Sequence, residues 1–369
     1  MAVLRLDLDN ILCFNAFSTT FSYPKKLVNS PLQGEYLNQF PKIRYRKVNI
    51  LVGSNASGKT SLGRAIWNTF LFLKEKEAGT ISRIVSNPNK GFSILMDCVF
   101  SSGLFFRAEI KKESPESELM VRLRQITAEK EDTYESLVGR LDEDTPFEHY
   151  ITALEQFRFG GWNFSFPSIE DGFDFIHCQY GKEEKEEFCA IFKDVLITMD
   201  PSIQDVSPSS EIPDSYIVRF RDGDAVAITN GDRLSSIRRL SSGTKYAVNV
   251  AGVIHAIKKH RKGFYFVDEQ FSYVNSEIEI ACLSKMIALL NDGEQLFFTS
   301  HNTELLKLPL PNHAFNFLRK EEGKEGYQIL WTNAATLEKR NNVSIKNLYD
   351  NDFFGASPNV ERILNIAED

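Results

Sequence analysis

Apolar and polar residues follow two periods along this chain, and together these periods predict a mixed α/β protein. Near the start, Leu4, Leu6 and Leu8 alternate with polar residues, which is typical of a half-buried strand. Residues 48–52 form a short, mostly apolar run that ends at a glycine, as buried strands do. Residues 59–75 repeat apolar side chains at helical spacing, so this strand is followed directly by an amphipathic helix.

The middle of the chain predicts antiparallel strands and then a charged, helical stretch. Residues 92–100 and 104–110 are apolar runs with a Ser-Ser-Gly turn between them, and residues 118–125 alternate again. We expect these three segments to form a small antiparallel meander. Residues 126–158 are charged and predict helix, and residues 186–199 predict a further helix.

The last part of the chain alternates strand and helix. Residues 216–220 and 225–229 flank the sequence Arg-Asp-Gly-Asp, which indicates a hairpin. Strand patterns at 264–267 and 295–299 enclose a helical pattern over 276–290. Such alternation predicts a mostly parallel sheet covered by helices.

Composition narrows the class of protein. The chain has 369 residues, of which 42% are hydrophobic, and 43 basic against 50 acidic side chains give a net charge of −7. With 29 Phe and 12 Tyr, a disordered chain is excluded. The negative charge excludes a protein that is basic all over its surface, although a local basic patch stays possible.

Location follows from two further features. No run approaches about 18 apolar residues, and Asp7 and Asp9 stand where a signal peptide needs an apolar core. The five cysteines are scattered and form no C-x-x-C pair, which is typical of reduced thiols and offers no zinc site. We therefore expect a cytoplasmic protein that does not contact a membrane.

The motif that decides the chemistry directly follows the strand at 48–52. It matches G-x-x-x-x-G-K-[ST] over Gly53, Ser54, Asn55, Ala56, Ser57, Gly58, Lys59 and Thr60. The glycines let the backbone turn tightly and point its N–H groups at phosphate oxygens. Lys59 is expected to contact the β- and γ-phosphates, and the Thr60 hydroxyl to bind Mg²⁺. A strand before and a helix after this motif are the setting that a nucleotide-binding phosphate loop requires.

A pair of carboxylates supplies the second part of the predicted site. Residues 264–267 are apolar and run into Asp268 and Glu269. Alone, such a pair after a strand is usually a solvated turn. Downstream of a phosphate loop, Asp268 suits Mg²⁺ through its water shell, and Glu269 suits a general base that polarises the attacking water.

Two weaker motifs complete the set. Ser241, Ser242 and Gly243 open a predicted helix, where small residues at the N-terminus make an anion site. His301 follows the strand at 295–299, 32 residues after Glu269, and can reach a γ-phosphate. Each would be unremarkable alone, and their place around the carboxylates raises their significance.

In this order the four motifs resemble those of the ABC-type ATPases. The resemblance is to the soluble branch of structural-maintenance-of-chromosomes and DNA-repair ATPases, and most of all to compact anti-phage defence ATPases of the OLD, Septu and PARIS types. Residues 241–243 then correspond to the signature loop and His301 to the switch histidine, and Phe14 and Phe17 resemble the family's N-terminal region.

The resemblance implies a P-loop fold with an ABC-type head, in which a mostly parallel sheet covered by helices is joined by an antiparallel β-subdomain and a helical insertion. It divides the chain into residues 1–125 with the phosphate loop, the insertion at 126–215, and 216–369 with the signature loop, carboxylates and switch histidine. It also implies a head-to-tail homodimer with two ATP molecules at the interface, so that hydrolysis depends on closure and the ATPase acts as a switch.

The chain departs from the family pattern at several points. Residues 270–272 read Gln-Phe-Ser where transport ATPases carry Pro and Thr, the signature reads LSSGTK in place of LSGGQ, and residues 273–275 read Tyr-Val-Asn. The family's glutamine after the antiparallel strands stays unassigned among Gln125, Gln156 and Gln179.

Length constrains the biological role. Gly53 and Ser241 are only 188 positions apart, which is too short a separation for the coiled-coil arm of a chromosome ATPase, and the 68 residues after His301 are too few for a nuclease domain. We expect the sensor or regulatory ATPase of an anti-phage system that controls a separate effector, a nuclease or toxin. The alternative is a DNA-repair ATPase that contacts DNA through the basic clusters at 238–239 and 258–262; a transporter subunit fits poorly.

Overall fold

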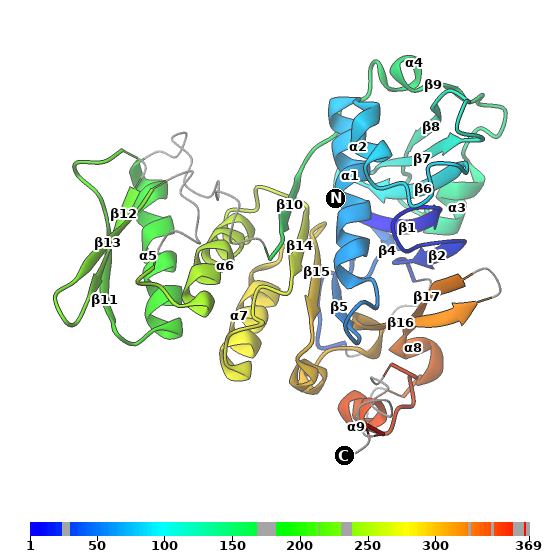
Figure 1. Cartoon of the computed structure of the whole chain (residues 1–369). Coiled ribbons are helices and arrows are strands. Elements are labelled where there is room, and N and C mark those ends of the chain that lie inside the picture. The colour runs from blue at the N-terminus through cyan, green and yellow to red at the C-terminus, as the bar shows by residue number, and fades with distance from the viewer. Residues whose placement is uncertain are drawn as a thin grey trace. The chain divides into compact units, whose positions relative to one another are not determined.

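The computed structural model divides into two compact units (Figure 1). The first unit comprises Met1–Trp162 and Asn291–Asp369, and the second comprises Asn163–Leu290. The structure describes residues 1–23, 30–167, 182–213, 215–229, 238–323, 326–340, 343–356 and 365–366. Among them, no helix combines the length and apolar composition that crossing a membrane requires.

Six antiparallel strands form one sheet of the first unit. They lie in the order β2-β1-β6-β7-β8-β9 and comprise β1 (Ala2–Asp9), β2 (Phe17–Thr20), β6 (Phe92–Val99), β7 (Leu104–Lys112), β8 (Met120–Thr127) and β9 (Glu148–His149). The side chains of Leu4, Leu6 and Leu8 are buried, as their alternation predicts. The meander expected from the three apolar segments is confirmed as β6, β7 and β8.

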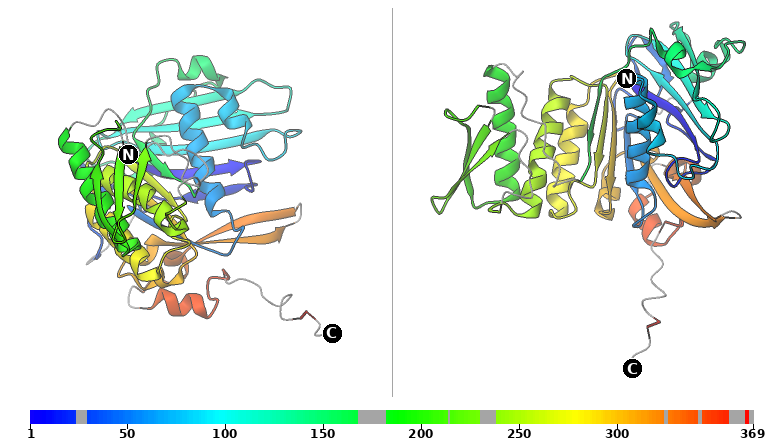
Figure 2. Two further views of the ribbon diagram at one scale, coloured as in Figure 1. Left: turned by 60° about the vertical axis from the view of Figure 1, so that its left-hand side comes forward. Right: turned by 45° about the horizontal axis from the view of Figure 1, so that its top comes forward.

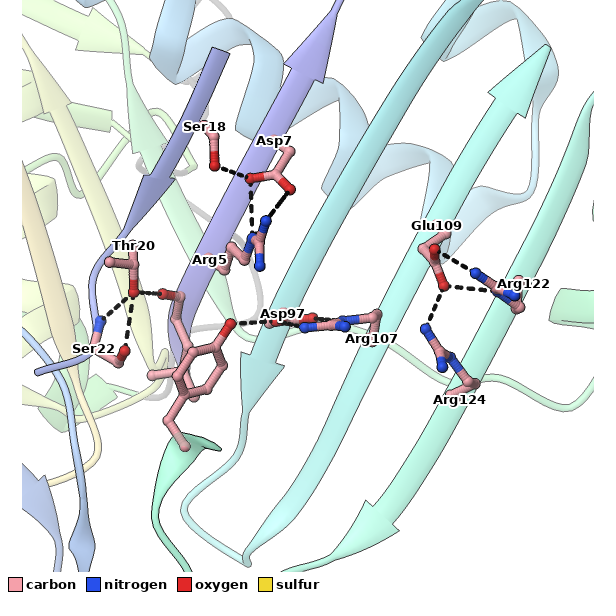
Figure 3. A network of polar contacts seen from close by, with 12 residues as sticks. Arg5, Asp7, Ser18, Thr20, Ser22, Asp97, Arg107, Glu109, Arg122 and Arg124 are labelled. Atoms are coloured by element: carbon pink, nitrogen blue, oxygen red, sulfur yellow. Dashed lines mark hydrogen bonds and ion pairs between the residues drawn. The ribbon is translucent and has the colours of Figure 1, made fainter. Parts of the chain in front are cut away.

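The other face of this sheet carries a network of ion pairs (Figure 3). The fully buried carboxylate of Asp97 accepts two hydrogen bonds of 2.7 Å from Arg107 and one of 2.7 Å from the hydroxyl of Tyr134. The hydrogen bonds to Asp97 raise the pKa of Arg107. Glu109 pairs in the same way with Arg122 and Arg124 across the β7–β8 ladder. Charged side chains thus hold three neighbouring strands together.

A second group of strands in the first unit is mostly parallel. It comprises β5 (Val48–Val52), β15 (Gln295–Ser300), β16 (Phe315–Gly323) and β17 (Gly326–Asn333). Strand β5 pairs in parallel with both β15 and β16, and β17 is antiparallel to β16. Every residue of β5 and β15 is buried, which explains why most of their residues are apolar.

Helix α1 (Lys59–Glu75) follows β5 through the phosphate loop and has the bounds that its periodicity predicts (Figure 1). Its carboxyl end is closed by Lys76 in a left-handed conformation, with φ of 60°. The remaining elements of this unit are short: β3 (Tyr36–Leu37), β4 (Phe40–Arg44), α2 (Ala78–Ser82), η2 (Thr303–Lys307), η3 (Asn312–Ala314), α8 (Ala334–Leu337) and α9 (Ile345–Asp350).

In the second unit, a helix separates a small sheet from a helical layer. Helix α5 (Lys182–Met199) contacts α6 (Ser242–Lys258) on one side and β11 (Ile203–Pro208) on the other (Figure 2). The predicted hairpin is confirmed as β12 (Ser215–Phe220) and β13 (Ala225–Thr229), which extend the sheet from β11. The unit also contains β14 (Phe264–Asp268), next to β10 (Trp162–Ser165), and α7 (Ser276–Leu289).

The charged stretch at 126–158 is less helical than its sequence predicts. It forms two short helices, α3 (Tyr134–Gly139) and α4 (Tyr150–Leu154), and the strand β9. A capping box of Thr133 and Ser136 starts α3, but the carboxylate of Asp142 then accepts hydrogen bonds from residues two and three positions ahead and forms a turn. Local side-chain bonds therefore replace a longer helix here. The division into 1–125, 126–215 and 216–369 stays a prediction.

Candidate functional site

The phosphate loop lies between the carboxyl end of β5 and the first turn of α1. Gly58 is the N-cap of this 17-residue helix and has φ of 100°, which favours glycine because a side chain is strained there. Gly53 is required for a different reason: a Cβ at this position would lie 2.4 Å from the carbonyl oxygen of Leu318 on β16. The backbone geometry thus explains both motif glycines.

The ammonium group of Lys59 is folded over this loop. Its Nζ donates hydrogen bonds to the carbonyl oxygens of Gly53 at 2.8 Å and Ser54 at 3.2 Å, and only 3% of the residue is exposed. Nδ1 of His301 lies 3.5 Å from the same Nζ. Because β5 and β15 are parallel with Val52 opposite Ser300, the segments that follow the two strands meet at one edge. The structure therefore brings together two predicted site residues that are 242 positions apart.

The loop fits a bound phosphate chain. The hydroxyl of Ser57 is buried and has no hydrogen-bond partner among the described residues, while Asn55 and Ala56 are exposed and Thr60 is partly exposed. The positive end of α1 and the charge of Lys59 both favour an anion. No group of three or more His, Cys, Asp or Glu in the described part of the chain is placed to hold a metal ion.

Residues not predicted from the motifs pack beside Gly58. A Cβ on this glycine would lie 3.3 Å from Sγ of Cys13 and 3.4 Å from Ile329. Burial raises the pKa of the Cys13 thiol, and a weaker hydrogen bond with Ser61 opposes the change. Phe14 lies next to Cys13 with its ring buried, and its centroid is 4.7 Å from that of Phe17. In the sequence, the spacing of Phe14 and Phe17 is the only signal for these residues beside the phosphate loop.

The predicted catalytic carboxylates lie in the second unit. Asp268 is the last residue of β14 and is fully buried, whereas Glu269 is partly exposed. The backbone of Glu269 has φ of 44°, a left-handed conformation that costs a non-glycine residue about 1–3 kcal/mol. Such strain is found where the surrounding structure over-determines a functional conformation.

The residues predicted to form the signature loop, 241–243, lie at the start of α6 in the same unit. Ser241 is the N-cap, and its Oγ accepts a hydrogen bond from the backbone N–H of Thr244. Ser242 is exposed and begins the helix, and Gly243 is buried behind it. Ser242 is therefore accessible to solvent at this helix end. The predicted site residues thus form two groups: the phosphate loop with His301 in the first unit, and the carboxylates with the signature loop in the second.

Both basic clusters are largely paired with carboxylates. Lys258 and Lys259 bind Glu187 of α5, and their hydrogen bonds lower the pKa of that carboxyl to about 2. Arg261 pairs with Glu184, also on α5. Two carboxylates of α5 thus engage three basic side chains at and just beyond the carboxyl end of α6, within one unit.

The other basic cluster, at 238–239, is held in a similar way. Arg239 pairs with Asp222 and Asp224 in the β12–β13 turn, and its guanidinium lies 4.5 Å from the ring centroid of Phe220. The charge of Arg239 is therefore paired with carboxylates of the same unit.

The family's glutamine stays unassigned. Gln125 is exposed on β8 and Gln156 is exposed just after α4, while Gln179 lies outside the described residues. Neither of the two described glutamines has a contact that favours it over the other.

Comparison with solved structures defines the architecture. An SMC head bound to the C-winged helix domain of ScpA matches 92% of this chain and 100% of its own, with a TM-score of 0.51 and 12% sequence identity. The fold is that of an SMC head domain. Two further SMC heads also match. The head from Pyrococcus furiosus, which has an extended coiled coil and is bound to a ScpA domain, matches 90% of this chain and 97% of its own, with 11% identity and a TM-score of 0.47. The head from Thermotoga maritima matches 90% of this chain and 99% of its own, with 12% identity and a TM-score of 0.42. Protein-family models and curated proteins yield no match.

The SMC head fold confirms the predicted class. It is a mixed α/β fold of the P-loop ABC type, with the phosphate loop after β5 and an antiparallel sheet in the same unit. At 12% identity the likeness establishes the fold alone.

Proposed function

We propose that this chain is an ABC-type switch ATPase that binds ATP with Mg²⁺ and hydrolyses it. The observation that carries the proposal is the position of Lys59, whose ammonium lies over the phosphate loop with His301 3.5 Å away, on the fold of an SMC head. Because this buried ammonium group donates to neutral carbonyl oxygens of its own loop, it is well placed to exchange these partners for phosphate oxygens.

Each candidate residue has a distinct chemical role in this proposal. Lys59 binds the terminal phosphates and Thr60 contributes its hydroxyl to Mg²⁺. Asp268 holds the metal's water shell, Glu269 orients and deprotonates the attacking water, and His301 contacts the γ-phosphate. Bound ATP with Mg²⁺ supplies the phosphoanhydride bond that is cleaved.

A homodimer completes the proposed site. The exposed Ser242 and the N-terminus of the 17-residue helix α6 form an anion-binding end in the second unit. In the head-to-tail arrangement, this end contacts the ATP held by the phosphate loop of the partner. Hydrolysis then depends on closure of the dimer.

For the biological role, we propose the sensor or regulatory subunit of an anti-phage system with a separate effector, a nuclease or toxin. The matched SMC head binds a winged-helix domain of a separate protein, which supports a head that acts through a partner. Direct action on DNA is less favoured because carboxylates engage Arg239, Lys258, Lys259 and Arg261. Stimulation of ATP hydrolysis by DNA, weakening with salt, would reverse this order.

Substitution of the phosphate-loop lysine tests the ATPase directly. Lys59→Ala is expected to weaken ATP binding at least tenfold, because hydrogen bonds to charged groups contribute about 1.5–3 kcal/mol each. Binding is measured with a fluorescent ATP analogue and hydrolysis by phosphate release. Lys285→Ala, at an exposed lysine of α7, is the control. Equal affinity and turnover in the Lys59 variant and the wild type would refute the assignment.

Substitution of the proposed base tests the switch. Glu269→Gln keeps the size of the side chain and removes its basicity, so we expect hydrolysis to fall by about 10²- to 10⁴-fold while ATP stays bound. Light scattering is expected to show an ATP-dependent dimer of this variant. A strict monomer at saturating ATP contradicts the in-trans arrangement but leaves the ATPase assignment intact.

A further inference from the structure

A buried glutamine next to the proposed base joins two elements of the second unit. Gln270 is fully buried, and both polar ends of its amide are used. Its Nε2 donates to the backbone carbonyl of Asp268 at 3.1 Å, and its Oε1 accepts from Nδ2 of Asn249 on α6 at 3.1 Å. One side chain therefore connects the backbone at the carboxylates with the helix that begins at the signature loop.

The same bond helps to hold the unusual backbone of Glu269. The peptide oxygen before this residue accepts the hydrogen bond from Gln270, and the oxygen after it accepts one of 3.1 Å from the hydroxyl of Ser272. Side-chain donors thus fix the peptide oxygens on both sides of a residue with φ of 44°. A left-handed glutamate persists only with such support, because its relaxed conformations lie elsewhere.

The loop after Glu269 follows a single face of α6. Asn249 bonds to Gln270, and the ring of Tyr246 stacks on that of Tyr273 with 6.0 Å between centroids and 5° between planes. One turn earlier, a Cβ on Gly243 would lie 2.9 Å from the carbonyl oxygen of Tyr273. The three helix positions are spaced by three residues, so they lie on one side of the helix.

We propose that Gln270 is a positioning residue that couples the signature helix to Glu269. A phosphate that engages the first turn of α6 shifts this helix as a rigid element, and the Asn249–Gln270 hydrogen bond carries the shift to the peptide before Glu269. The carboxylate then reaches its working orientation only when the signature loop is engaged. This inference rests on the proposed ATPase function and adds a route by which one site of a dimer controls the chemistry of the other.

Two nearly isosteric substitutions break the link. Asn249→Asp replaces the amide donor by a carboxylate, which cannot donate a hydrogen bond to the Gln270 oxygen. Gln270→Met fills the same volume and removes both hydrogen bonds. We expect each to lower kcat about ten- to a hundredfold, since small displacements of a reacting group have effects of this size. The affinity for the fluorescent ATP analogue stays within about twofold, because the phosphate loop is untouched.

Two further readouts separate positioning from loss of structure. The double variant is expected to be no slower than the slower single variant, because both changes break one connection. The kcat of Asn249→Asp relative to the wild type is expected to recover as pH falls from 7.5 towards 5, because a protonated carboxyl group again donates to Gln270. Asn249→Ala shows no such recovery. Gln204→Ala, at an exposed residue of β11, is the matched control.

The outcomes distinguish the inference from the function on which it rests. A wild type that neither binds nor hydrolyses ATP overturns both. An active wild type with single variants of unchanged kcat, or with additive losses in the double variant, overturns the coupling alone. The coupling is also overturned if kcat, ATP affinity and melting temperature fall together, because the residues are then structural.

Discussion

Substitution of Gly53 by alanine gives the most direct test of how the phosphate loop is built. The added Cβ would lie 2.4 Å from the carbonyl oxygen of Leu318 and 2.7 Å from Oγ of Ser57, where contacts of side-chain carbons essentially never fall below 3.0 Å. The hydroxyl can rotate away, but the carbonyl cannot. It belongs to β16, which is fixed by its parallel pairing with β5 at Phe317 and Val52.

Relief of this clash requires a shift of at least 0.6 Å between the loop and β16. Overpacking of this kind costs about 1–3 kcal/mol, and a unit of 150–250 residues loses about 2–4 °C in Tm for each kcal/mol. A displacement of about 1 Å in a binding loop is worth about a hundredfold in turnover. We therefore expect Gly53→Ala to melt several degrees lower and to bind the fluorescent ATP analogue much more weakly.

The matched control is Gly79→Ala in α2. No atom lies within 4 Å of a Cβ at this position, so alanine is expected to stabilise the protein by about 0.4–1 kcal/mol and to leave ATP binding unchanged. Differential scanning calorimetry and a binding titration measure both variants. If Gly53→Ala binds and melts as the wild type does, the steric account of this loop is refuted.

Two further predictions concern stability. Asp97→Asn keeps the shape of the side chain but leaves the guanidinium of Arg107 buried without its counter-charge; we expect a loss of about 3–5 kcal/mol in urea unfolding, and a loss below about 1 kcal/mol would contradict the buried ion pair. His255 is buried on α6, and burial lowers its pKa below 6.5, with Glu184 3.9 Å away as a weaker opposing influence. As pH decreases through about 6.5, the unfolded chain binds a proton on His255 before the folded chain does, so stability falls as pH decreases. Between pH 7 and 5 the wild type is expected to lose up to about 1.4 kcal/mol per pH unit more than His255→Gln; parallel pH profiles of the two proteins would contradict this.

Elements with a clear local period were predicted well. Because each pattern lies in adjacent residues, the strand at 48–52 and the helix at 59–75 have the bounds that their patterns predict, and the hairpin predicted at 216–229 begins one residue earlier, at Ser215. The charged stretch at 126–158 was mispredicted because Asp142 and its neighbours bond to nearby backbone groups. Strand β16 was not predicted at all, although it supplies the wall against which Gly53 is packed.

The chemical groups of the candidate site are evident from the amino-acid sequence, because a phosphate loop and a carboxylate pair at a strand end are local patterns. The residues that surround these groups depend on the tertiary fold. The parallel register of β5 and β15 places His301 beside Lys59, and two carboxylates of α5 pair with Lys258 and Arg261 of the basic cluster at 258–262. Residue composition reveals neither, because both depend on partners far away in the chain. The same holds for the left-handed Glu269 and its link to the signature helix, which arise from hydrogen bonds that no sequence period records.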